Sequence, residues 1–92
     1  MTRIVFRRSA LADLEALASH FDPIDPRITA RIVADIQRSV ARLADFPRSG
    51  EAIPHTSLRR ITSRRYRFTI SYFVGPERVE IVGVFRFQNR QS

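Results

Sequence analysis

The chain has 92 residues, enough for one small domain and too few for two domains that each have a core. It contains no cysteine, which excludes disulfide bonds and thiolate metal sites, and no apolar run approaches the length of a membrane span. Its first residues also lack the apolar run of a signal peptide. We therefore expect a single soluble, cytoplasmic domain over residues 1–92, with no metal and no other cofactor.

The charge is strongly positive and unevenly distributed. The formal net charge is +7, and all sixteen basic residues are arginine. Residues 1–56 hold eight arginines and seven acids (8 − 7 = +1), whereas residues 57–92 hold eight arginines and two acids (8 − 2 = +6). Such asymmetry favours an anionic partner, either nucleic acid or an acidic protein segment. The alternative is that the charges only keep the domain soluble.

The N-terminal part predicts a strand followed by a helix. Residues 3–6 are β-branched and aromatic, as in a short strand. Ser9 is a suitable N-cap, and apolar residues then recur at helical spacing as far as Phe21. Asp13 and Glu15 fall outside that apolar face and are expected to point away from it.

A second helix follows after a short break. The segment 22–26 contains two prolines; Asp25 is the expected N-cap and Pro26 the first helical residue. The helix should extend to about Asp45, with one apolar stripe and with Asp35 among the arginines outside it. Because the break is so short, the two helices are expected to form an antiparallel hairpin.

The remainder of the chain predicts consecutive strands. A loop over residues 51–57 precedes an arginine-rich strand over residues 58–62. Residues 66–74 alternate between apolar and mostly polar side chains, as in a strand with two different faces. A turn at residues 75–77 leads into the nearly all-apolar run 79–87, which is typical of a strand covered on both faces or central in a sheet.

The predicted fold is therefore α+β, in the order β-α-α-β-β-β, with a helical hairpin packed on one face of a small antiparallel sheet. The opposite face is expected to be more open. The polar row of the middle strand, formed by Arg67, Thr69 and Ser71, is expected to face solvent there.

This arrangement resembles the RelE/ParE superfamily of toxins from type II toxin–antitoxin modules over nearly the whole chain. The similar segments are Ala10–Leu14 after the first strand, Leu43–Gly50 at the end of the second helix, Arg65–Tyr72, and Val79–Phe85. The resemblance implies a toxin that causes growth arrest and is neutralised by a cognate antitoxin, whose acidic C-terminal segment wraps around it in a hetero-oligomer. RelE-like members cleave mRNA in the ribosome, whereas ParE-like members act on DNA gyrase.

Metal-independent RNA cleavage requires a base, an acid and cations that stabilise the phosphorane. Arginine supplies only the last of these, because its pKa is too high for proton exchange near neutrality. In a chain without lysine, the candidates for proton transfer are His55, Tyr66, Tyr72, Glu77 and Glu80. Each also has a structural interpretation: an exposed loop histidine, two tyrosines in the core with their hydroxyls at its rim, a solvated turn acid, and an acid paired with arginine.

The C-terminal residues favour the ParE branch. The superfamily commonly has a histidine where this chain has Arg86, and its RNA-cleaving members have a terminal tyrosine that this chain lacks. The basic face that would bind the target or the antitoxin is predicted to comprise Arg59, Arg60, Arg64, Arg65, Arg67, Arg86 and Arg90.

Two alternatives to a gyrase inhibitor remain. One is a ribosome-dependent endoribonuclease, in which Arg60, Arg65, Arg67 or Arg86 clamps the phosphate and His55 or a tyrosine moves protons. The other is a catalytically inactive interaction module that binds only the antitoxin.

Overall fold

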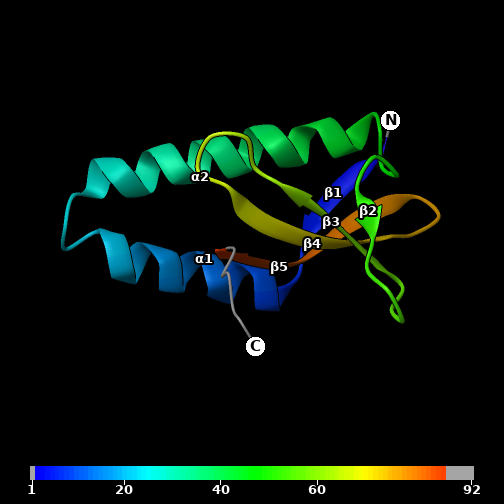
Figure 1. Ribbon diagram of the computed structural model, residues 1–92, viewed down its shortest axis with the longest axis horizontal. Coiled ribbons are helices and arrows are strands. Elements are labelled where there is room, and N and C mark those ends of the chain that lie inside the picture. Colours follow the sequence, from blue (N-terminus) through cyan, green and yellow to red (C-terminus); the bar gives the residue numbers. More distant parts are fainter. Residues whose placement is uncertain (1, 87–92) are drawn as a thin grey trace.

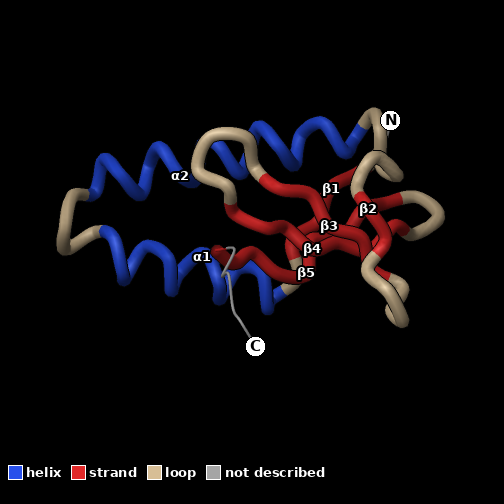
Figure 2. The backbone as a smooth tube through the Cα atoms, viewed as in Figure 1, coloured by secondary structure: helices blue, strands red, loops and turns tan. Residues whose placement is uncertain are grey.

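The computed structural model describes residues 2–86 and has an α+β architecture (Figures 1 and 2). The elements are β1 (Arg3–Phe6), α1 (Arg8–Phe21), α2 (Pro26–Ala41), the 3-10 turn η1 (Arg42–Ala44), β2 (Glu51–Ala52), β3 (Leu58–Thr62), β4 (Phe68–Val74) and β5 (Arg78–Arg86). The predicted order of helices and strands is confirmed. The end of the predicted last strand, at Phe87, lies outside the described residues.

The five strands form one sheet in the order β1-β5-β4-β3-β2. β1 pairs with β5 in parallel and the other neighbours are antiparallel, so the sheet is mixed rather than purely antiparallel. The parallel pair forms because the chain leaves β1 through both helices and three strands before β5 returns beside it. β2 has two residues, too few to show a strand pattern within the predicted loop 51–57.

The two helices run antiparallel as a hairpin along the sheet, as Figure 1 shows, and the predicted break between them is confirmed. Asp25 caps α2 by accepting a hydrogen bond from the Arg27 amide at 3.0 Å, and Pro26 occupies the first turn. The α-helix ends at Ala41, and its continuation to Ala44 is the 3-10 turn. In the described residues, neither helix is long and apolar enough to cross a membrane.

The start of α1 differs from the prediction. Its N-cap is Arg7, which makes no side-chain cap, and Ser9 instead donates a hydrogen bond to the Val82 carbonyl oxygen of β5. Asp13, one helical turn later, accepts from the Val84 amide at 2.9 Å rather than pointing to solvent. β1 ends opposite Ile81, so these two side chains satisfy the β5 edge where no strand lies beside it.

β5 contains a β-bulge that explains its apolar run. Ser71 pairs with Gly83 and Tyr72 pairs with Ile81, which leaves Val82 as the extra residue. The bulge shifts the alternation by one residue, so the buried face carries Val79 and Ile81 before it and Val84 after it.

The opposite face of β4 is less open than predicted. Thr69 and Ser71 are both buried. β4 is the central strand, and each of these small side chains lies between residues of the two neighbouring strands, as Thr69 does between Thr62 and Phe85. A short side chain on a central strand is shielded from water by the strands on both sides, and Ser71 lies between Arg60 of β3 and Gly83 of β5.

The core lies between the helices and the sheet. Its largest fully buried side chain is Tyr72, and the other buried apolar residues are Ala10, Leu17, Ile32, Ile36, Val40, Leu43, Phe68, Ile70, Val79, Ile81 and Val84. The predicted apolar stripe of α2 supplies four of the buried positions of the helical layer: Ile32, Ile36, Val40 and, in η1, Leu43.

Candidate interaction surfaces

A tight turn joins β3 to β4 over residues 63–67. The Ser63 amide donates to the Phe68 carbonyl oxygen at 2.8 Å, and the Ser63 hydroxyl accepts from the Phe68 amide at 2.9 Å. Arg67 has a φ of 62°, in the left-handed region that few residues other than glycine adopt. The predicted strand start at Tyr66 is therefore wrong, because this conformation ends the turn and β4 begins at Phe68.

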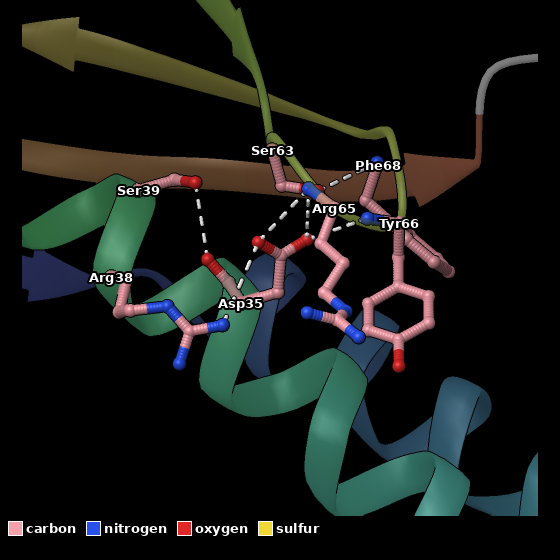
Figure 3. A network of polar contacts seen from close by, with 7 residues as sticks. All are labelled: Asp35, Arg38, Ser39, Ser63, Arg65, Tyr66 and Phe68. Atoms are coloured by element: carbon pink, nitrogen blue, oxygen red, sulfur yellow. Dashed lines mark hydrogen bonds and ion pairs between the residues drawn. The ribbon is translucent and has the colours of Figure 1, made fainter.

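Asp35 attaches this turn to α2, as Figure 3 shows. Its carboxylate accepts from the Tyr66 amide at 2.8 Å and from the Arg65 amide at 3.2 Å. Asp35 is only 2% exposed, so its predicted place outside the apolar stripe is wrong. Periodicity predicts that a carboxylate points away from the apolar stripe. It contains no information about the backbone amides, thirty residues away, that bind Asp35 in the fold.

The Asp35 carboxylate is held in its charged form. Burial by itself raises the pKa of Asp35, but hydrogen bonds from the Tyr66 amide, the Ser63 side chain and the Arg65 amide outweigh it. The pKa therefore lies below its usual value of 3.8, and Arg38, 4.0 Å away, adds a favourable charge. A carboxylate with these partners has a structural role in positioning the turn.

The predicted basic residues do not share one face. Arg59 and Arg60 are adjacent in β3 and point to opposite sides of the sheet. Arg59 donates to the Gly50 carbonyl oxygen at 2.7 Å, which gives it a structural role, and Arg60 pairs with Glu51 at 3.1 Å. Neither guanidinium is free of protein partners.

The other predicted basic residues lie in two places. Arg64, Arg65 and Arg67 are exposed in the β3–β4 turn. Arg86 lies at the end of β5, with its guanidinium carbon 5.5 Å from the ring centre of Phe21 in α1. Arg90 lies outside the described residues.

The structure adds two arginines that the prediction of a sheet surface missed. Arg38 and Arg42 are four residues apart at the C-terminal end of α2, beside the turn that Asp35 holds. Arg42 and Arg64 both line a hollow of about 280 Å³ next to β3. The i, i+4 spacing was visible in the sequence, but only the fold brings these residues to the turn.

A second ionic cluster lies near the start of the sheet. The Glu80 carboxylate accepts from Arg7 at 2.7 Å and from Arg78 at 2.9 Å. The hydrogen bonds from Arg7 and Arg78 hold the pKa of Glu80 below its usual value. The predicted pairing of Glu80 with arginine is confirmed, and a carboxylate of this kind is unsuited to donate a proton near neutrality.

The remaining proton-transfer candidates also have structural surroundings. Tyr72 is fully buried and its hydroxyl accepts from the Gly50 amide at 2.9 Å, so its core position is confirmed but its hydroxyl does not reach the rim. Tyr66 is half-buried against the core. His55 is exposed in its loop, and Glu77 is exposed in the turn before β5. No group of three metal-binding side chains occurs within residues 2–86.

An apolar hollow of about 330 Å³ lies between α1 and the end of β5. Its apolar lining comes from Ala16, Leu17 and Phe21 of α1, Phe68 of β4, and Val84 and Phe85 of β5. The polar residues Asp13, His20 and Arg86 also line it. Phe85 is 51% exposed, an unusual position for a phenylalanine. The molecule thus has a basic region at α2 and the turn and an apolar region at α1 and β5.

A family model identifies the family of this chain, and a solved structure identifies its fold. The model of the family described as ParE toxin of type II toxin-antitoxin system, parDE, matches residues 4–91. Among solved structures, a chain of the "Chromosomal ParDE TA system from P. aeruginosa" superimposes with a TM-score of 0.82 and 24% sequence identity, covering 96% of this chain and 98% of that one. No curated protein matches this chain. At this identity the structural likeness establishes the fold.

Proposed function

Because this chain belongs to the ParE toxin family of type II toxin–antitoxin systems, we propose that it is a toxin that inhibits DNA gyrase and is neutralised by a cognate antitoxin. The match to the ParE family over residues 4–91 carries this proposal. The toxin acts by binding, without a chemical step of its own.

The surroundings of the proton-transfer candidates support a binding role. Glu80 is fixed between two arginines, and Tyr72 is buried with its hydroxyl engaged by a backbone amide. His55 lies in an exposed loop. RNA cleavage needs an acid and a base on the two sides of one phosphate, and the Glu80 carboxylate and the Tyr72 hydroxyl are both engaged by partners within the fold.

The proposed antitoxin segment fits the apolar hollow between α1 and β5. An amphipathic segment that inserts apolar side chains beside Phe85 would bury surface that is now exposed. Arg86 lines the same hollow and could pair with a carboxylate of an acidic segment. Toxin and antitoxin are proposed to form a hetero-oligomer through this contact.

The test combines purified protein, gyrase, ATP and relaxed plasmid. Inhibited supercoiling, or accumulation of cleaved plasmid after denaturation of gyrase, is the expected result, and prior mixing with the antitoxin should abolish it. The substitution Phe85→Glu tests the proposed antitoxin site. It replaces an exposed apolar contact by a charge, so the antitoxin should neutralise this variant less well, while the toxin keeps its fold. Normal supercoiling at a large excess of toxin would exclude the proposal.

An assay of mRNA cleavage distinguishes the alternative functions. Primer extension on translated mRNA after induction should show intact transcripts. Codon-biased cuts would establish an endoribonuclease instead, and unaffected growth despite tight antitoxin binding would establish an interaction module.

A further inference from the structure

We propose that α2 and the β3–β4 turn form a binding surface for the phosphate backbone of duplex DNA. The surface consists of Arg38, Arg42, Arg64, Arg65 and Arg67, and we call it the α2–turn surface. The choice of DNA rests on the proposed function, because gyrase holds DNA while it works. The arginine geometry itself does not depend on that function.

These residues come from two segments that are distant in the sequence and adjacent in the fold. The Asp35 carboxylate binds the Arg65 amide and lies 4.0 Å from the Arg38 guanidinium, so the helix and the turn meet there (Figure 3). Arg42 and Arg64 line the same hollow. The hydrogen bond from the Arg67 amide to the Ser63 carbonyl oxygen, at 3.2 Å, closes the turn that carries the last arginine.

The surface is strongly positive. Its five arginines are exposed, and the acid that lies between the helix and the turn, Asp35, is buried with its oxygens occupied by backbone amides. The local balance is therefore +4 (5 − 1). Glu51 also lines the hollow shared by Arg42 and Arg64, but it pairs there with Arg60 at 3.1 Å, so this pair adds no net charge.

The spacing suits a nucleic-acid backbone. Arg38 and Arg42 are one helical turn apart, about 6 Å along the axis. One strand of a duplex presents a phosphate about every 3.4 Å of axis, so the two arginines span about two phosphates. Guanidinium groups bind phosphate oxygens through two parallel hydrogen bonds, which a lysine cannot do.

An acidic protein segment suits this surface less well. A segment that orders on binding must bury apolar area, and the centres of protein interfaces are depleted in charged residues. Of the exposed large apolar residues of the described chain, Leu11, Ile24 and Phe85 lie in other segments, and only Phe46, whose amide donates to the Arg42 carbonyl oxygen at 3.0 Å, borders this surface. Binding here would be almost entirely electrostatic, as it is for a phosphate backbone.

The experiment measures fluorescence anisotropy of a labelled duplex of about 20 base pairs, titrated with the full chain at several salt concentrations. Five phosphate contacts predict a slope of log K against log[salt] of about −4.5. The affinity should then fall about 500-fold between about 50 and 200 mM salt. Absence of binding at the low-salt end would overturn the inference.

Two variants with equal charge locate the surface. R42Q/R64Q removes two arginines of the α2–turn surface, and the slope should fall by about 1.8. R3Q/R8Q removes two exposed arginines of β1 and α1 and should leave the slope nearly unchanged. Equal losses in both variants would show that only the overall charge matters, and would refute the proposed surface.

A third variant guards against unfolding as the cause. Arg67→Gly removes one charge at a left-handed position that glycine adopts without strain, so the turn should keep its shape while the slope falls by about 0.9. Thermal unfolding followed by circular dichroism should show folded protein for all three variants. Unchanged DNA binding by folded R67G and R42Q/R64Q would also overturn the inference.

Two further outcomes separate this inference from other proposals. If poly-glutamate displaces the duplex at equal charge concentration, the surface is a site for an acidic protein and the DNA proposal is wrong. Gyrase inhibition without DNA binding would overturn this inference and leave the proposed function standing. DNA binding without gyrase inhibition would support this inference and overturn the proposed function.

Discussion

Replacing Asp35 by alanine should destabilise the fold strongly, because this buried carboxylate joins α2 to the β3–β4 turn. It accepts from the Arg65 and Tyr66 amides, thirty and thirty-one residues away. The alanine variant leaves both amides without their acceptor in a part-buried place and frees the turn from the helix.

The expected magnitude follows from these two hydrogen bonds. A hydrogen bond to a charged group contributes about 1.5–3 kcal/mol, so two contribute about 3–6 kcal/mol. Water that enters the space left by the side chain recovers part of this, and we expect a loss of about 3 kcal/mol. A domain of this length has a free energy of unfolding of about 5–14 kcal/mol, so the loss is a large fraction of the total.

The assay is urea unfolding followed by circular dichroism. Asp35→Asn should lose less than Asp35→Ala, since its amide oxygen still accepts one hydrogen bond. Gln37→Ala is the matched control, because Gln37 is exposed on the same helix and its loss should cost no more than about 0.5 kcal/mol. The reasoning is refuted if Asp35→Ala and Gln37→Ala unfold at the same urea concentration.

Two other predictions concern pH and the core. Because the pKa of Asp35 is below its usual value of 3.8, its stabilisation is present above that pH and is lost as the pH falls through the folded-state pKa; the gap in unfolding free energy between wild type and Asp35→Asn should therefore shrink in acid. A gap that is constant from neutral pH to pH 3 would contradict this. Tyr72→Phe should cost about 1–3 kcal/mol, since the buried Gly50 amide loses its acceptor, and an unchanged urea midpoint would show that water replaces the hydroxyl.

The sequence by itself determined the helical hairpin and the succession of strands. Asp25 and Pro26 act within one turn of the chain, so their effect does not depend on the rest of the fold. The apolar stripe of α2 and the run Val79–Phe87 also identify elements that must be covered. The resemblance to the RelE/ParE superfamily depends on this local order, whereas the preference for the ParE branch depends on Arg86 and on the missing terminal tyrosine.

The tertiary structure decided where the polar side chains act. Helical periodicity predicted that Asp13 and Asp35 would point away from the apolar stripes of their helices, yet Asp13 binds the edge of β5 and the buried Asp35 binds a turn. The partner of Asp13 lies seventy-one residues away in the sequence, and the nearest partner in the turn bound by Asp35 lies thirty residues away. Helical periodicity contains no information about contacts at such separations.

The arginines illustrate the same limit. The sequence determined their number and their excess after residue 57, but strand pairing placed Arg59 and Arg60 on opposite faces. Asp35 binds both the backbone of Arg65 in the turn and the side chain of Arg38 in α2. These two arginines therefore lie near each other, and not on the single basic sheet face that the charge distribution predicted. The physical reason is that a strand sends alternate side chains to opposite sides, whereas a buried carboxylate can fix a turn wherever its amides reach it.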